Sequence, residues 1–107
     1  MNDPALYREQ LGTVFQTEYE SLRLELRLAD VVEERATAGL QQFSLFFHGP
    51  VHPILQQGTY SFDHHTLGAL AVFIVPVLGS SPERIVYQAC FSRPVPDSTG
   101  ATNRDRV

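Results

Sequence analysis

The stretch Leu70-Ala-Val-Phe-Ile-Val-Pro-Val77 decides how this chain can fold. Every position is apolar, so an extended strand here would carry Leu70, Val72, Ile74 and Pro76 on one side and Ala71, Phe73, Val75 and Val77 on the other. A strand with one face in water alternates apolar and polar residues, so we expect both sides of this one to be covered. Proline cannot donate a hydrogen bond to a ladder, and Pro76 therefore favours a sheet edge or a bend.

Two coverings of this strand are open: an N-terminal helix of the same chain, or a second copy of the chain. An edge strand that is apolar on both faces pairs with other chains unless something covers it. We expect the chain to be its own partner, most simply as a two-fold homodimer. The expected self-association residues are Val72, Phe73, Ile74, Val75 and Val77.

Four other segments have the same period of two. The segment from Tyr19 to Val32 is predicted to be one strand, because leucines at 22, 24, 26 and 28 alternate with charged residues. Further strands are expected over 43–48, 59–62 and 85–91, and the charged stretch 33–40 is expected to be a turn.

A short helix is expected ahead of the strands. Asp3 can cap its first turn, Pro4 suits its first position, and Gly12 suits the left-handed residue beyond its end. Tyr7 and Leu11 give the helix one apolar stripe, which needs a surface to lie on.

These elements predict a mainly β fold with a short N-terminal α-helix and a strongly bent five-stranded antiparallel sheet. Short connections require antiparallel neighbours, and such a sheet curls into a small barrel of the Sm-like or SH3-like type. A small open sandwich is the alternative. Residues 1–93 should form this single domain, and residues 94–107, rich in proline and polar residues, should be a disordered tail.

The composition narrows the classes of partner. The chain has 107 residues, a formal net charge of −4 and no lysine. It therefore lacks the basic stripe with which proteins attract nucleic acid, and an anionic membrane is disfavoured as well. We see no signal peptide, and the apolar run 67–78 is too short for a membrane helix, so a cytoplasmic protein is expected.

We expect no catalytic, metal or cofactor residues. His48 and His52 have Gly49 and Pro50 between them and cannot share a helix face, and His64 is expected to face solvent beside a turn. A composite site of His48, Asp63, His64 and Cys90 would require the strands to bring them together. Cys90, the one cysteine, is expected to be packed and inert.

A second surface is a candidate for partner contact. The irregular segment 49–60 displays Val51, His52, Ile54 and Leu55, and loops that expose apolar residues often contact partners. The alternative is that Ile54 and Leu55 cover the end of the barrel.

Three segments of the chain resemble a known family. They are similar to an uncharacterised bacterial family of single small domains, and they read Phe43-Ser-Leu-Phe-Phe-His-Gly-Pro50, Leu55-Gln-Gln-Gly-Thr-Tyr60 and Leu67-Gly-Ala-Leu-Ala-Val-Phe-Ile-Val-Pro-Val77. Members of that family often accompany phage-tail-like proteins, so the resemblance implies an accessory or assembly role. The order of elements also resembles the Sm-like small barrel, in topology only.

The leading expectation is a non-catalytic interaction or assembly module that self-associates. Two alternatives stay open: a nucleic-acid-binding Sm-like barrel, and a small enzyme with a histidine metal site.

Overall fold

The computed structural model describes residues 3–37 and 39–94. It contains one helix and six strands: α1 (Pro4–Arg8), β1 (Val14–Tyr19), β2 (Leu22–Thr37), β3 (Leu40–Gly49), β4 (Gly58–His64), β5 (Gly68–Ser81) and β6 (Arg84–Pro94). The strands pair antiparallel and close into a small barrel in the order β1-β2-β3-β6-β5-β4. The predicted fold class, a mainly β barrel behind a short N-terminal helix, is confirmed.

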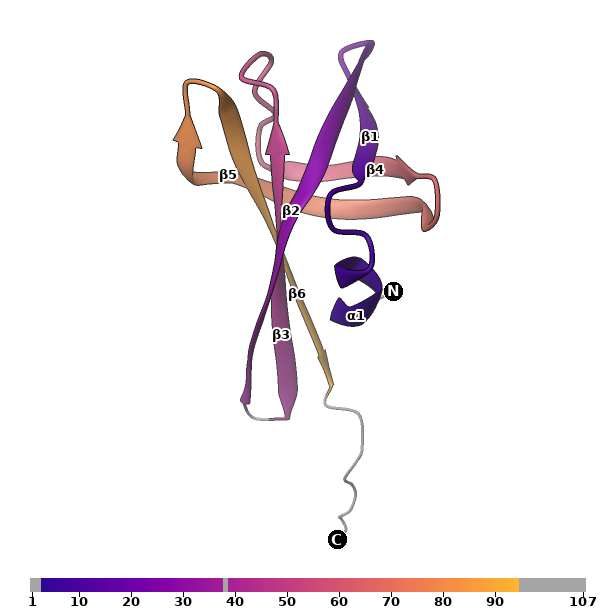
Figure 1. Ribbon diagram of the computed structural model, residues 1–107, viewed down its shortest axis with the longest axis vertical. Coiled ribbons are helices and arrows are strands. Elements are labelled where there is room, and N and C mark those ends of the chain that lie inside the picture. The colour runs from indigo at the N-terminus through magenta and orange to yellow at the C-terminus, as the bar shows by residue number, and fades with distance from the viewer. Residues whose placement is uncertain (1–2, 38, 95–107) are drawn as a thin grey trace, which may run out of the picture.

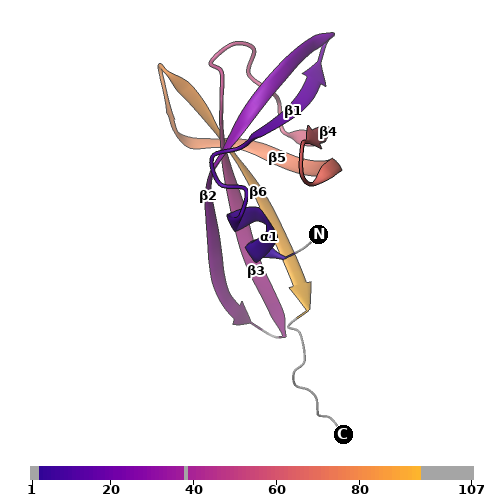
Figure 2. The same cartoon turned by 45° about the vertical axis from the view of Figure 1, so that its right-hand side comes forward.

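Three long strands give the molecule its shape. β2, β3 and β6 cross the barrel and continue beyond it as a narrow three-stranded sheet, whereas β4 and the first part of β5 run across their direction (Figures 1 and 2). α1 lies in the angle between these two parts, beside the extended sheet. Pro94 ends β6, and the rest of the expected tail, residues 95–107, lies outside the described residues.

The sixth strand, β1, precedes a turn that the sequence did not predict. The expected strand over 19–32 includes the turn of a hairpin: β1, which covers 14–19 and was not expected, meets β2 at Glu20 and Ser21 with φ of 52° and 70°. Hairpin turns of two residues with positive φ normally carry Asn or Gly, because these residues tolerate the left-handed region. Neither occurs here, so the leucine alternation hides the turn.

The expected turn over 33–40 is also wrong. β2 continues to Thr37 and pairs with β3, which begins at Leu40. The pairing register shifts between Leu28 and Asp30, so the buried side of β2 passes from Leu28 to Val31. A bulge of this kind bends the strand and lets a charged segment extend a ladder without burying its charges.

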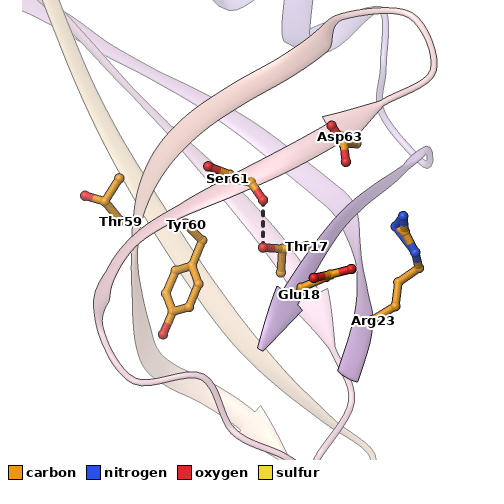
Figure 3. Close-up of a pocket in the computed structure, with 7 residues that line it drawn as sticks. All are labelled: Thr17, Glu18, Arg23, Thr59, Tyr60, Ser61 and Asp63. Carbon is orange, nitrogen blue, oxygen red and sulfur yellow. Dashed lines mark hydrogen bonds between the residues drawn. The ribbon is translucent and has the colours of Figure 1, made fainter. Parts of the chain in front are cut away.

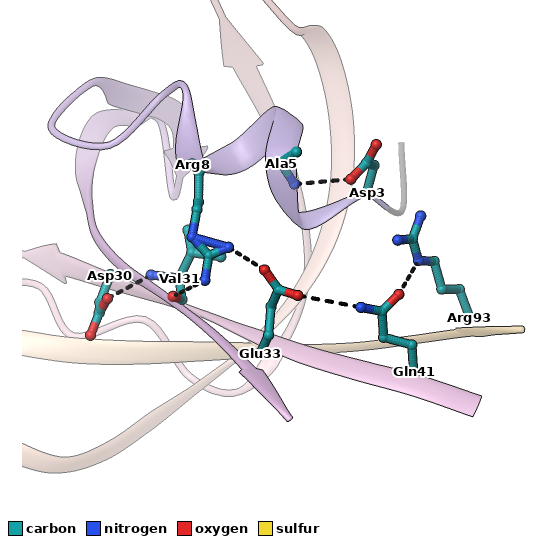
Figure 4. A network of polar contacts seen from close by, with 8 residues as sticks. All are labelled: Asp3, Ala5, Arg8, Asp30, Val31, Glu33, Gln41 and Arg93. Atoms are coloured by element: carbon teal, nitrogen blue, oxygen red, sulfur yellow. Dashed lines mark hydrogen bonds and ion pairs between the residues drawn. The ribbon is translucent and has the colours of Figure 1, made fainter. Parts of the chain in front are cut away.

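The helix begins as its sequence predicts but ends at Arg8, four residues before Gly12. The Asp3 carboxylate accepts a hydrogen bond from the Ala5 amide at 2.9 Å, Pro4 occupies the first turn, and Gly12 has φ of 85°. Arg8 forms an ion pair with Glu33, which also accepts a hydrogen bond from Gln41 (Figure 4). This network ties α1 to β2 and β3.

Aromatic rings fill the interior in two groups. Under the helix, the Tyr7 ring contacts the rings of Phe43 and Phe91. Phe43 and Phe91 stack on each other, with 5.0 Å between their centroids. In the barrel, Phe47 stacks on Phe62, and the edge of Phe15 meets Phe47 at 5.2 Å. Edge-to-face and offset rings add attraction beyond the area that they bury.

Candidate interaction surface

The apolar strand changes partner halfway along its length. Residues 68–74 of β5 pair with β4, and residues 75–81 pair with β6. Pro76, opposite Tyr87, lies just after this change. Each half of β5 therefore has a neighbouring strand on one flank, and no other described strand pairs with the opposite flank.

The structure divides the five residues expected to self-associate between two faces. Val72 and Ile74 point into the barrel, where they are 3% and 0% exposed, so they cannot meet a partner. Phe73 points outward and is 52% exposed. Val75 and Val77 follow it along the outer side and are half-buried.

The outer side of β5 is apolar over several residues and has uncharged neighbours. Ala71 lies opposite Ser61, and Phe73 opposite Thr59, both of β4. Val75 lies opposite Gln88 of β6. We call the outward-facing residues Ala71, Phe73 and Val75 the β5 surface.

The helix does not cover the β5 surface. α1 packs against β2, and its buried Tyr7 reaches Phe43 of β3 and Phe91 of β6. The first of the two expected coverings, the N-terminal helix, is therefore wrong. In the part of the chain that the structure describes, Phe73 stays open to solvent.

The loop expected to contact partners splits in the same way. Leu55 is fully buried and closes the end of the barrel, with its amide donating a hydrogen bond to the Tyr87 hydroxyl at 2.8 Å. Ile54, the preceding residue, is 49% exposed. His52 is exposed, and Val51 is half-buried. Only part of this loop is available to a partner.

Replacing Tyr87 with Phe is expected to lower the free energy of unfolding by about 1–3 kcal/mol. The change removes the acceptor of a buried amide and leaves that amide without a protein partner. Urea unfolding checks this, with Tyr60→Phe as control because the Tyr60 hydroxyl donates to the Gln56 carbonyl in the exposed loop before β4. Equal losses in the two variants would contradict the buried role of the Leu55 amide.

His64 is a buried structural residue, and the expectation that it faces solvent is wrong. It is 5% exposed, and its ring lies 4.4 Å from that of Phe15. Its Nδ1 accepts hydrogen bonds from the amides of Thr66 and Leu67, at 3.0 and 3.1 Å. Its Nε2 must then carry the proton of the neutral ring and donate to the Thr13 hydroxyl at 2.8 Å.

These hydrogen bonds keep His64 neutral. Burial, and secondarily the charge of His65, lowers the pKa of His64 below its usual 6.5. Protonation of Nδ1 would also break both bonds from the turn. His64 thus joins the β4–β5 turn to the segment between α1 and β1, where the Thr13 hydroxyl donates to the Gln10 carbonyl.

Of the other residues of the composite site, Asp63 precedes His64 and lines the same hollow, whereas His48 and Cys90 lie on other strands. His48 lies on β3 opposite Arg27, and burial, followed by the charge of Arg84, lowers its pKa. Cys90 lies on the outer side of β6 beside Ser44 and is exposed, so the expected packed cysteine is wrong. Among residues 3–37 and 39–94, no group of three His, Cys, Asp or Glu side chains could hold a metal ion.

A polar hollow of about 420 Å³ lies where β1 and β4 separate (Figure 3). The two strands pair only at Gln16 and Asp63, and beyond this point the Thr17 hydroxyl donates to the Ser61 carbonyl at 2.7 Å. Glu18, Arg23 and Asp63 stand around the opening. Neither histidine nor cysteine lines it.

No helix in the described ranges is long and apolar enough to cross a bilayer. Comparison with curated proteins found no match, and comparison with solved structures found none either. A family model does match, from residue 3 to residue 91, and so covers the helix and nearly all of the barrel. The chain therefore belongs to the family described as domain of unknown function (DUF6916).

Proposed function

We propose that this domain is a non-catalytic interaction module that self-associates through the β5 surface. The observation that carries the proposal is Phe73, a large aromatic side chain that is half exposed and lies opposite the uncharged Thr59. Aromatic residues of this kind are the usual energetic centres of protein interfaces.

The surroundings of Phe73 support the same conclusion. Its neighbours along the strand, Ala71 and Val75, are apolar, and the residue paired with it, Thr59, is uncharged. Burial of this surface would remove apolar area from water without removing a charge from water, so association has no large electrostatic cost. The family resemblance to proteins found beside phage-tail-like proteins agrees with a role in assembly.

The environment of His64 favours an interaction module over an enzyme. The one deeply buried histidine, His64, has both ring nitrogens hydrogen bonded within the protein. General acid–base work needs a group that can reach a substrate and exchange a proton with it. We therefore assign His64 to the architecture and the β5 surface to function.

Replacing Phe73 with Asp is expected to weaken self-association at least roughly 30-fold, which corresponds to about 2 kcal/mol for a central interface residue. The charged side chain remains solvated in the monomer, so the fold should survive. Size-exclusion chromatography with light scattering, run as a dilution series, measures the change.

The matched control is Leu22→Asp. Leu22 is 53% exposed, close to the 52% of Phe73, but lies beside the turn between β1 and β2, two strands that do not pair with β5. This variant should associate like the wild-type chain. If both variants weaken association equally, or if neither does, the β5 surface is not the interface.

A further inference from the structure

The flank of β5 over residues 68–74 is the second unusual feature of this strand. It pairs with β4 on one side, while β6 joins β5 only from Val75 onward. On the other side, the backbone groups of this segment have no strand partner among the described residues. An open strand edge of this kind is a template for another strand.

We propose that the second copy binds by antiparallel pairing of this flank with its own residues 68–74, which rests on the proposed self-association. The two barrels would then share one continuous sheet through their β5 strands. A two-fold axis makes such an interface self-complementary, because each copy offers the same edge in the opposite direction.

Charge favours a second copy as the occupant. The chain carries a net charge of −4, so surfaces with carboxylates would repel one another. The segment from Gly68 to Ile74 has no charged side chain, so the two paired strands would place no like charges opposite each other; Asp63 of β4, opposite Ala69, is the acidic residue paired with this segment. Edge strands are usually protected from pairing by charged side chains, especially lysine. This segment has no charged side chain.

The side chains also fit when the two segments overlap completely. Ala71 is the middle residue, so it would lie opposite Ala71 of the second copy, and Phe73 would lie opposite Ala69 of the second copy. Cross-strand side chains of such pairs approach to roughly 4.5–5.5 Å between Cβ atoms. Ala69 and Phe73 are both exposed, and the small side chain leaves room for the large one. Pro76, which lacks an amide hydrogen, limits the pairing at one end.

Opposite charges placed at Ala71 test this arrangement. Ala71→Lys and Ala71→Glu each place like charges face to face across the two-fold axis, so each variant alone should associate at least roughly tenfold more weakly than the wild-type chain. An equimolar mixture should recover a dimer that contains one copy of each, detected by native mass spectrometry. Circular dichroism confirms that both variants fold.

Amide hydrogen exchange gives an independent readout. Diluting the wild-type dimer to monomer should accelerate exchange within residues 69–73 at least roughly tenfold, because strand pairing protects amides that the monomer leaves open. Amides of β3, which is paired on both sides, serve as the internal control.

The outcomes separate the two proposals. A wild-type chain that stays monomeric overturns self-association and strand pairing together. A wild-type dimer without recovery in the Lys and Glu mixture, and without protection of residues 69–73, overturns strand pairing alone and leaves self-association through the outer face of Phe73. Recovery together with protection supports both.

Discussion

Tyr7→Ala should lower the free energy of unfolding by about 3–5 kcal/mol, the range for truncating a large buried aromatic residue. Tyr7 is 2% exposed although it belongs to a helix of only five residues. Its ring contacts Phe43 and Phe91 at centroid distances of 6.0 and 5.7 Å. So short a helix is unstable alone, and this contact supplies most of what fixes it to the sheet.

Leu6→Ala is the matched control for that experiment. Leu6 is the neighbouring residue in α1, but it is 38% exposed, so its side chain buries less apolar surface than that of Tyr7. Tyr7→Phe should retain most of the stability, because it preserves the ring. Urea unfolding measures all three variants. A Tyr7→Ala loss no larger than that of Leu6→Ala would mean that the helix is not held by its aromatic contact.

His64→Ala is expected to lower the free energy of unfolding by about 2–4 kcal/mol. The change removes the acceptor of two part-buried amides in the β4–β5 turn, and a donor left without an acceptor costs up to about 1–3 kcal/mol. It also removes the ring that packs on Phe15. His64→Asn should recover part of the loss, because an asparagine side chain can accept amide hydrogen bonds two residues ahead.

The same residue should make the fold sensitive to acid. The pKa of His64 is lower in the folded chain than its usual 6.5, because burial and then His65 disfavour its charged form. The unfolded chain therefore binds protons more readily, and the free energy of unfolding falls as the pH drops below 6.5. Asp63 and His65 are the titratable groups beside His64.

Comparison of wild type with His64→Asn isolates this effect. His48 also has a lowered pKa, so it too lowers the free energy of unfolding as the pH drops. This contribution is the same in both proteins and cancels in the comparison. Urea unfolding at several pH values should show a steeper loss for the wild-type chain between neutral pH and mild acid. Parallel curves for the two proteins would contradict the neutral role of His64.

The sequence predicted those parts of the fold that depend on a simple period. Alternation placed Phe43, Leu45 and Phe47 on the inner side of β3, and all three are buried. The start of α1 was predicted equally well, since an Asp–Pro pair is a local signal. Such features need no knowledge of the rest of the chain.

The features that the sequence did not reveal depend on distant contacts. The turn at Glu20 and Ser21 lacks the usual residues, and pairing of β1 with β2 forces its positive φ values. His64 gives no local sign of burial, because its partners Thr13 and Phe15 lie about fifty residues away in the chain. Its hydrogen bonds to Thr66 and Leu67 are local, but many turn histidines face water.

The β5 surface was predicted in part for the same reason. Eight apolar residues in a row indicated that both sides of the strand need cover. They did not indicate which side of the strand the barrel itself would bury. Closure of the barrel buries Val72 and Ile74 and turns Phe73 outward, so the unmet need lies on one side only.

The concentration dependence of sedimentation by the wild-type chain is the most direct test of a module that self-associates. Sedimentation velocity should show conversion from monomer to dimer as the protein rises from nanomolar to high micromolar concentration. A single monomeric species of about 12 kDa across that whole range would contradict the proposed function.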